Sequence, residues 1–379
     1  MRVLITPMSA IVETKGPFSR TILLANEFIK RGHEVALCAA EDPNYHSIEN
    51  VKNYYAPIPS MLDISEITDK NILKKLQEKT MNSFEEVLNF IGAINEEFFA
   101  NDVHYIRKAI QEFNPDVIYT EFRIAAIVAA KLERIKVATG FSFTVKKSFA
   151  CNPEYSGGVN KYLEENNLNK VESVLEIFDW ANLKVVPSSY EIEPIDGENV
   201  VFVGPLSSSN TITVKEKKNK IVAYMGNGTI SPMKLIEELT KAFENSKYEV
   251  YIATGEVEPY KKNNININKR FDFNKLMPEA MAYINHGGQN SIMTGLIYGV
   301  PQIICPGNVF ERKYNASSIV KLNAGKMLEA KDFDCKIITK IIGEFNEDST
   351  YANNSKKSGE MLLSLGGVTK AVQAIEELV

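Results

Sequence analysis

The sequence predicts an α/β protein with two Rossmann-like domains, because strands and helices alternate in the same order in both halves of the chain. In the first half, a buried strand at residues 2–6 precedes a helix with one apolar face at residues 18–31 and a second strand at residues 34–40. In the second half, a strand at residues 221–225 precedes a helix at residues 232–243. Buried strands that alternate with helices form parallel sheets.

The length of the chain and one change in composition suggest where the domains divide. The chain has 379 residues, whereas a typical domain has roughly 150. A Gly-Pro-Leu-Ser-Ser-Ser stretch begins at Gly204, and a charged run that ends at Lys220 follows it. This composition is typical of a linker. We therefore expect a first domain at 1–205, a linker at 206–220, a second domain at 221–354 and a C-terminal helical segment at 355–379.

Charge and hydropathy exclude several classes of protein. A net charge of −5 gives no basic footprint for nucleic acid. No apolar run approaches the roughly 18 residues that span a membrane, and the N-terminal apolar run is too short for a signal peptide. The cysteines (Cys38, Cys151, Cys305 and Cys335) are far apart in the sequence, as expected of free thiols in a reducing compartment. We expect a cytoplasmic protein, and leave open a peripheral contact with a membrane surface.

Residues 284–316 carry the strongest functional signal of the chain. A strand ends before His286-Gly287-Gly288, and Gln289, Asn290 and Ser291 then open a helix. The N-terminus of a helix presents backbone N–H groups and a partial positive charge, so it can hold a phosphate. The glycines allow a ligand to approach the backbone, and the polar side chains add hydrogen-bonding groups. The pattern predicts an anion site rather than an ordinary strand–helix connection.

This region resembles the donor-binding signature of nucleotide-sugar glycosyltransferases with the GT-B fold, of the macrolide, plant natural-product and UDP-glucuronosyl type. The matching residues are His286-Gly287-Gly288-Gln289-Asn290-Ser291, Gly299-Val300-Pro301, Pro306, Glu311-Arg312 and Asn315-Ala316. Weaker matches occur in the family's order at Arg31-Gly32-His33-Glu34-Val35, Pro115-Asp116-Val117-Ile118, Phe202-Val203-Gly204-Pro205-Leu206 and Gly228-Thr229. The resemblance implies two Rossmann-like domains that face a cleft, with the last helix crossing back onto the first domain.

The resemblance also implies roles for individual residues. His286 would bind the diphosphate of the donor, with Asn290 and Ser291 beside it. Gly228 and Thr229 would lie near the phosphates, and Phe273 is our candidate for contact with the base. Glu311 and Arg312 would face the hydroxyls of the sugar.

The chain departs from the family at the catalytic base. Family members carry a histidine before the first helix that deprotonates the acceptor, but alignment on Gly16 and Ala25 places Pro17 there. Glu121 occupies the position of the aspartate that orients this histidine in the family. A carboxylate at this place takes a proton if desolvation raises its pKa. Our candidates for the base, or for a group that positions the acceptor, are Glu121 and Glu13, with an ordinary surface or capping carboxylate as the alternative for Glu121.

Two further departures concern the donor. Thr294 stands where the family often has a glutamate that binds both ribose hydroxyls, which makes a deoxyribose nucleotide such as dTDP more plausible. Arg312 replaces a glutamine that faces the sugar. Since arginine pairs with carboxylates, an acidic donor sugar is one hypothesis. An ion pair between Arg312 and Glu311 is the alternative.

Together these observations predict a glycosyltransferase that moves a sugar from a UDP- or dTDP-sugar to a small, apolar acceptor with inversion. The nucleotide-sugar is a co-substrate, and we expect neither a cofactor nor a metal ion. We interpret the Asp-x-Asp sequence at Asp332 as a chance match. A non-catalytic sugar-nucleotide-binding or partner-stabilising relative and a nucleotide-sugar epimerase are the alternatives. Homodimer formation is left open.

Overall fold

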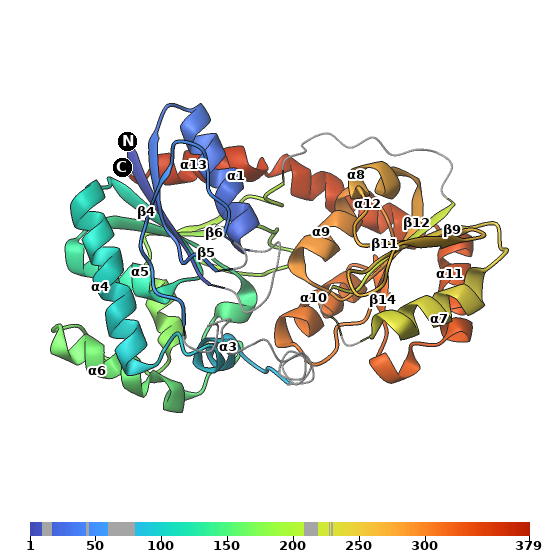
Figure 1. The fold of residues 1–379 in the computed structure, drawn as a ribbon, viewed down its shortest axis with the longest axis horizontal. Coiled ribbons are helices and arrows are strands. Elements are labelled where there is room, and N and C mark those ends of the chain that lie inside the picture. The colour runs from blue at the N-terminus through green and yellow to red at the C-terminus, as the bar shows by residue number, and fades with distance from the viewer. Residues whose placement is uncertain (10–16, 43–44, 60–79, 208–218, 227, 229) are drawn as a thin grey trace. The chain divides into compact units, whose positions relative to one another are not determined.

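The computed structural model describes residues 1–9, 17–42, 45–59, 80–207, 219–226, 228 and 230–379 (Figure 1). These residues form two compact units. The first comprises the described residues of Met1–Ile72 and Met81–Ser208 together with Leu365–Val379. The second comprises those of Leu73–Thr80 and Ser209–Ser364. Two α/β units agree with the fold class that the alternation of strands and helices predicts.

The described part of the first unit contains a seven-stranded parallel sheet in the order β3-β2-β1-β4-β5-β6-β7. Its strands are β1 (Arg2–Pro7), β2 (Glu34–Cys38), β3 (Lys52–Tyr54), β4 (Val117–Glu121), β5 (Lys136–Gly140), β6 (Leu183–Val186) and β7 (Val200–Phe202). Its α-helices are α1 (Pro17–Lys30), α3 (Phe84–Phe90), α4 (Glu96–Phe113), α5 (Ile124–Glu133), α6 (Gly157–Glu165) and α13 (Gly367–Glu376).

The chain's last helix, α13, belongs to the core of the first unit and packs against α1 (Figure 1). Val3 and Ile5 of β1 belong to the same apolar cluster as residues of both helices, as expected of side chains that alternate along a strand. Glu376 of α13 also accepts hydrogen bonds from Arg31 Nη1 at 2.7 Å and pairs with His33 Nε2 at 2.6 Å. Apolar packing and these ion pairs therefore join the two ends of the chain.

The described part of the second unit also contains a seven-stranded sheet, in the order β10-β11-β9-β8-β12-β13-β14, parallel except for the β10–β11 pair. Its strands are β8 (Lys220–Tyr224), β9 (Glu249–Ala253), β10 (Tyr260–Lys262), β11 (Ile265–Asn268), β12 (Ala280–Asn285), β13 (Gln302–Ile304) and β14 (Gly325–Met327). Its α-helices are α7 (Pro232–Phe243), α8 (Phe273–Leu276), α9 (Gln289–Ile297), α10 (Phe310–Lys321), α11 (Cys335–Glu347) and α12 (Thr350–Ser364).

The boundary between the second unit and the C-terminal segment lies at Ser364–Leu365, ten residues after the position that the sequence suggests. We expected residues 355–379 to act as one segment, but α12 belongs to the second unit and only the residues from Leu365 onward belong to the first. Gly366 and Gly367 have φ angles of +93° and +57°, which favour glycine and interrupt the helix. Gly359 allows α12 to lie against α9, because a Cβ atom there would be 2.2 Å from the Leu296 carbonyl oxygen.

Each sheet has one point at which the strand order reverses direction. In the first unit, β1 lies between β2 and β4, and in the second unit β8 lies between β9 and β12. The loops that leave the two central strands then run to opposite sides and leave a crevice at the carboxyl ends of the strands, where open α/β sheets bind ligands. The predicted site residues His286 and Glu121 follow or end strands at these two points.

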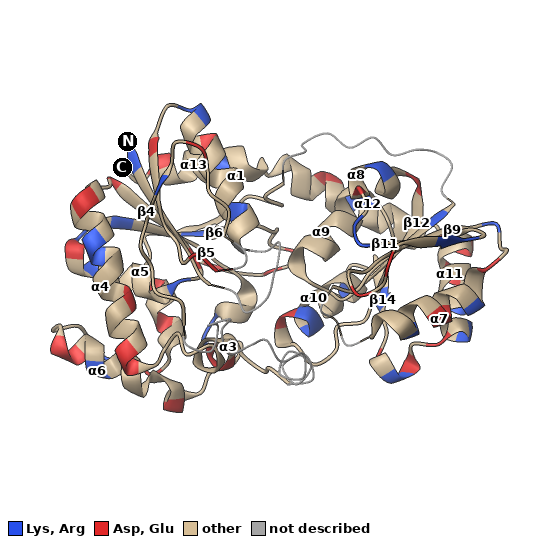
Figure 2. Cartoon of the chain, in the orientation of Figure 1, with Lys and Arg blue, Asp and Glu red and all other residues tan. Residues whose placement is uncertain are grey.

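Two properties of the described residues bear on partners. No helix among them is long and apolar enough to cross a membrane. Basic and acidic residues are interspersed on the helices of both units (Figure 2).

Candidate functional site

The candidate site of the second unit is built from the loops that follow β8 and β12. Gly228 donates its N–H to the Met225 carbonyl at 2.7 Å, which turns the first loop sharply. A Cβ atom on Gly228 would lie 3.2 Å from His286 Cβ, so the loop after β8 touches the residue that follows β12. The predicted residues Gly228 and His286 therefore come together. Thr229 lies outside the described residues.

A buried polar network holds the turn at His286. Asn285 Oδ1 accepts a hydrogen bond from Gly287 N–H at 2.8 Å, and Asn285 Nδ2 donates to Gln302 Oε1 at 3.0 Å. Gln302 Nε2 in turn donates to the Ile292 carbonyl of α9 at 3.0 Å. Our sequence analysis did not select Asn285 or Gln302. One sequence feature could have indicated them: Asn285 is a polar residue at the end of the apolar strand β12, and Gln302 is one at the start of β13. Buried polar groups require hydrogen-bond partners.

Gly287 allows α10 to approach the turn closely. Its φ angle is +82°, and a Cβ atom there would be 2.9 Å from the Arg312 carbonyl oxygen and 3.0 Å from Ile304 Cγ2. Asn315 Nδ2 donates to the Gly287 carbonyl at 2.8 Å. The turn is therefore fixed to α10 through backbone contact and one side-chain hydrogen bond.

Helix α9 starts directly at this turn. Its N-cap is Gly288, which has no side chain to cap the helix, and a Cβ atom on Gly288 would lie 2.7 Å from His286 Nε2. The first turn of any helix contributes N–H groups that its own hydrogen bonds do not use. Ser291 is buried, and its hydroxyl lies close to the Tyr283 phenol, whereas Asn290 is exposed.

The environment of His286 keeps its ring neutral. Burial lowers the pKa of His286 to about 3, and the positive charge of Arg312 acts in the same direction. Its ring makes an edge contact with Tyr224, with the ring centres 5.7 Å apart. The buried Nδ1 atom has no hydrogen-bond partner among the described residues. His286 is therefore an uncharged hydrogen-bonding group at neutral pH.

Phe273 connects to the same place through aromatic contacts. Its ring lies 6.0 Å from that of Tyr224 and 5.8 Å from that of Tyr283, both with edge geometry. Tyr224 therefore lies in contact with both Phe273 and His286. The Tyr224 ring thus lies between Phe273, which is predicted to contact the base, and His286, which is predicted to bind the diphosphate.

Glu311 and Arg312 lie in the first turn of α10, the helix whose backbone lies against Gly287. Burial lowers the pKa of Arg312, while Glu311 and Tyr224 act in the opposite direction. Glu311 Oε1 accepts a weak hydrogen bond from Asn315 Nδ2 at 3.4 Å. The positive charge of Arg312 is near enough to lower the pKa of His286, and Tyr224 acts on the pKa of Arg312.

Thr294 directs its hydroxyl toward its own helix. The Oγ1 atom donates to the Asn290 carbonyl at 2.7 Å, a common arrangement for threonine inside helices.

The predicted residues of the first unit have a different environment. Glu121 ends β4 and is 1% exposed. Its Oε1 atom accepts a hydrogen bond from Arg20 Nε at 2.6 Å, and its Oε2 atom accepts one from the Tyr119 hydroxyl. Glu121 is therefore a buried ion-pair partner rather than a surface or capping carboxylate. Pro17 is the first residue of α1, and Glu13 lies outside the described residues.

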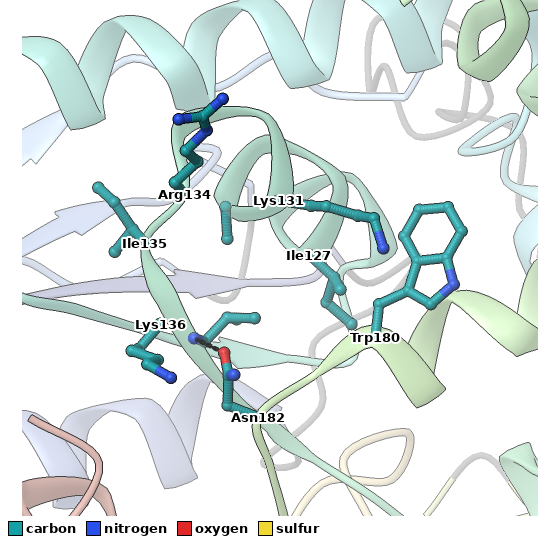
Figure 3. Close-up of a pocket in the computed structure, with 9 residues that line it drawn as sticks. Ile127, Lys131, Arg134, Ile135, Lys136, Trp180 and Asn182 are labelled. Atoms are coloured by element: carbon teal, nitrogen blue, oxygen red, sulfur yellow. Dashed lines mark hydrogen bonds between the residues drawn. The ribbon is translucent and has the colours of Figure 1, made fainter. Parts of the chain in front are cut away.

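A pocket of the first unit lies at the opposite end of the strands (Figure 3). Apolar side chains such as Ile127 line it together with Lys131, Arg134 and Trp180. The Lys131 ammonium group lies 4.3 Å from the centre of the Trp180 ring. Lys136, another lining residue, is the first residue of β5, so the pocket is at the amino end of that strand. Ligands of parallel sheets bind at the carboxyl ends, and we do not assign this pocket to the substrates.

Glu238, Asp334 and Cys335 form a group within the described residues whose ligand atoms lie within 4.8 Å of one another. Structural hydrogen bonds explain this grouping. Asp334 caps α11 by accepting from Lys336 N–H at 2.8 Å, and Glu238 accepts from Cys335 N–H at 2.9 Å.

Comparisons with known proteins show what this chain is similar to. Residues 255–378 match the family of the Erythromycin biosynthesis protein CIII-like C-terminal domain. The uncharacterized UDP-glucosyltransferase YojK of Bacillus subtilis (strain 168) is 24% identical, with 73% of this chain and 76% of the relative covered. The NDP-glycosyltransferase YjiC of Bacillus licheniformis is 23% identical over 96% of this chain and 95% of the relative. The solved structure of the spinosyn rhamnosyltransferase SpnG complexed with thymidine diphosphate has a TM-score of 0.70 at 15% identity, covering 99% of this chain and all of that one.

Proposed function

Since this chain is a glycosyltransferase of the GT-B fold, we propose that it transfers a sugar from a UDP- or dTDP-sugar to a small acceptor with inversion. The observation that carries this proposal is the turn from His286 to Gly288 at the start of α9. It lies at the carboxyl end of β12, beside the loop that follows β8. A glycine turn, a helix N-cap residue without a side chain and a neutral histidine at such a position suit a diphosphate.

In this proposal the diphosphate binds to the backbone of α9 and to His286. Gln289 and Asn290 supply the first N–H groups of the helix, whereas the Ser291 N–H donates to the Gly288 carbonyl at 2.9 Å and Ser291 offers its side chain. A phosphate oxygen would provide the hydrogen-bond partner that His286 Nδ1 lacks among the described residues. These donors stabilise the charge that develops when the diphosphate leaves, and this stabilisation requires no metal ion.

The nucleotide is the second part of the proposal. Phe273 contacts the base, and the row of Phe273, Tyr224 and His286 leads from the base to the diphosphate. Thr294 already donates its hydroxyl to Asn290, so it cannot bind two ribose hydroxyls as a carboxylate would. This supports a place for dTDP-sugars beside UDP-sugars. The proteins that this chain resembles include both a UDP-glucosyltransferase and a rhamnosyltransferase whose structure was solved with thymidine diphosphate.

The transfer itself is a single displacement. The acceptor hydroxyl oxygen forms a bond to the anomeric carbon as the bond from that carbon to the diphosphate oxygen breaks, and the hydroxyl proton passes to a base. Glu121 and Glu13 remain our candidates for this base. Glu121 is 1% exposed and both of its oxygens accept hydrogen bonds, from Arg20 and Tyr119, so proton transfer to Glu121 requires the acceptor hydroxyl to reach a buried, ion-paired carboxylate. A role in positioning the acceptor through Arg20 requires no such approach.

A mass-spectrometric screen tests the proposal. The protein is incubated with UDP-glucose, UDP-N-acetylglucosamine, UDP-glucuronate and dTDP-sugars in the presence of a library of apolar hydroxyl-bearing acceptors. We expect a product that carries the mass of one donor sugar, and we expect His286→Ala to abolish it. The matched control is His104→Ala, because His104 is exposed on α4. An isomerised donor, or donor binding without any product, would contradict the proposal.

A further inference from the structure

The first turn of α10 brings a cation to the proposed diphosphate site. Arg312 is the charged side chain whose electrostatic effect reaches His286, and it also interacts with Tyr224. Tyr224 packs against His286 with the ring centres 5.7 Å apart. The three side chains come from β8, from the loop after β12 and from α10. The rings of Tyr224 and His286 are in contact where the strand order of the second sheet reverses, and the charge of Arg312 acts on His286 there.

The backbone fixes the base of the Arg312 side chain. A Cβ atom on Gly287 would lie 2.9 Å from the Arg312 carbonyl oxygen, and Asn315 ties the Gly287 carbonyl to α10 at 2.8 Å. The Gly287 N–H also donates a hydrogen bond to Asn285 Oδ1 at 2.8 Å. These contacts hold the first turn of α10, and with it the backbone of Arg312, beside the start of α9.

The charges at the site make this position important. A nucleoside diphosphate carries several negative charges, and more charge develops on it as the bond to the sugar breaks. Burial lowers the pKa of His286 to about 3, so this residue contributes hydrogen bonds but no positive charge at neutral pH. Arginine stays protonated in proteins and forms paired hydrogen bonds with phosphate oxygens.

We propose that Arg312 binds the diphosphate of the donor and supplies the positive charge that stabilises the departing nucleoside diphosphate. This inference rests on the proposed function and deepens it, because it assigns Arg312 to the diphosphate rather than to the sugar. The competing assignment is an ion pair between Arg312 and the carboxylate of an acidic donor sugar. The neighbouring Glu311 accepts a weak hydrogen bond from Asn315 at 3.4 Å, and its charge acts to raise the pKa of Arg312.

Binding measurements on the full chain separate these assignments. Isothermal titration calorimetry is carried out with UDP, UMP and uridine, and with dTDP, dTMP and thymidine, on wild type, Arg312→Gln and Arg312→Lys. We expect Arg312→Gln to weaken nucleoside diphosphate binding roughly 10- to 100-fold, the effect of removing a charged hydrogen-bonding group. Nucleoside binding is expected to stay within about twofold, and Arg312→Lys to keep most of the diphosphate affinity.

The matched control is Lys313→Gln, which removes the same charge from the next, exposed residue of α10. It is expected to leave all affinities within about twofold, since exposed charges are screened by solvent. A steeper loss of UDP affinity with salt in wild type than in Arg312→Gln would support direct contact with the phosphates.

Each of the following results would contradict this inference or the proposed function on which it rests. Equal losses for uridine and UDP would indicate a structural role for Arg312. Unchanged UDP affinity, with a selective loss for UDP-glucuronate relative to UDP-glucose, would assign Arg312 to the sugar. Failure of the wild-type protein to bind any nucleoside diphosphate would overturn the proposed function itself. Normal wild-type binding with no effect of Arg312→Gln would overturn this inference alone.

Discussion

Arg20 Nε donates a hydrogen bond to Glu121 Oε1 at 2.6 Å, and both side chains are almost fully buried. The resemblance to the family places Glu121 where other members have the aspartate that orients the catalytic histidine. In this chain Pro17 replaces that histidine, and Arg20, in the same first turn of α1, pairs with the carboxylate instead. If the resemblance holds, an Arg20–Glu121 ion pair replaces the histidine and aspartate of the family.

We predict that Glu121→Gln strongly destabilises the protein. The substitution leaves the buried Arg20 without its carboxylate, and such losses typically cost about 3–5 kcal/mol. The free energy of unfolding from urea titration measures this effect. The matched control is Glu133→Gln, because Glu133 also pairs with an arginine (Arg107) at 2.6 Å but is partly exposed. Its loss is expected to be below about 1 kcal/mol.

Turnover below the unfolding transition then separates the roles of Glu121. A large fall in kcat in the folded Glu121→Gln protein would support proton transfer or acceptor positioning. Unchanged turnover with the true acceptor would show that Glu121 is only structural. A loss of stability no larger than that of Glu133→Gln would contradict the buried ion pair.

The adjacent glycines of the turn are expected to respond differently to alanine. In Gly287→Ala the Cβ atom meets the Arg312 carbonyl at 2.9 Å in a backbone conformation with φ of +82°. We therefore expect a stability loss of about 1–3 kcal/mol. In Gly288→Ala the Cβ atom meets His286 Nε2 at 2.7 Å, with an ordinary φ of −63°. We expect this change to displace the imidazole and to weaken donor binding more than stability.

Thermal unfolding and nucleotide titration of both variants test this difference. Gly343→Ala is the control, because a Cβ atom there meets nothing within 4 Å in helix α11. Donor affinity that falls equally in Gly288→Ala and Gly343→Ala would contradict a close contact between Gly288 and His286.

The elements with strong local signals could be predicted from the sequence. Helix α7 has the predicted bounds, since Ser231 caps it and Pro232 favours its first turn. Helix α9 also begins at the predicted Gln289, directly after the glycine turn. Strands β3 and β10 were not predicted. Each has three residues, contains lysine and lies at the edge of its sheet, so their pairing comes from the tertiary structure and not from an apolar pattern.

The site shows the same limit. His286 and Gly228 could be predicted to meet because sequence motifs mark the ends of two strands. The partners of Glu121 could not, since Arg20 is 101 residues away in the sequence and looks like an ordinary helix residue. Asn285 and Gln302 likewise acquire meaning only when their strands pair.

His286 is expected to make the protein less stable in acid. Its pKa is about 3 in the folded protein against an ordinary value of 6.5, so the unfolded chain binds a proton more readily between these values. The stability that depends on neutral His286 is fully present above about pH 6.5, falls as the pH falls, and is lost below about pH 3. The slope is at most about 1.4 kcal/mol per pH unit.

Urea unfolding at pH 7, 6, 5 and 4 measures this slope in wild type and in His286→Gln. We expect a shallower acid dependence in the variant, because glutamine does not titrate. Parallel curves for the two proteins would show that His286 is not held neutral by the fold. His104→Gln, at an exposed histidine, provides the control.

Thr294→Glu is expected to increase the preference for ribose. The wild-type hydroxyl is bound to the Asn290 carbonyl at 2.7 Å, whereas a glutamate at this position would accept hydrogen bonds from both ribose hydroxyls, as the resemblance to the family implies. Hydrogen bonds to a charged group contribute about 1.5–3 kcal/mol. The affinity ratio of UDP to 2′-deoxy-UDP should therefore rise at least about tenfold. Thr294→Val, which only removes the hydroxyl, should leave the ratio unchanged. A constant ratio in Thr294→Glu would mean that the ribose lies away from this face of α9.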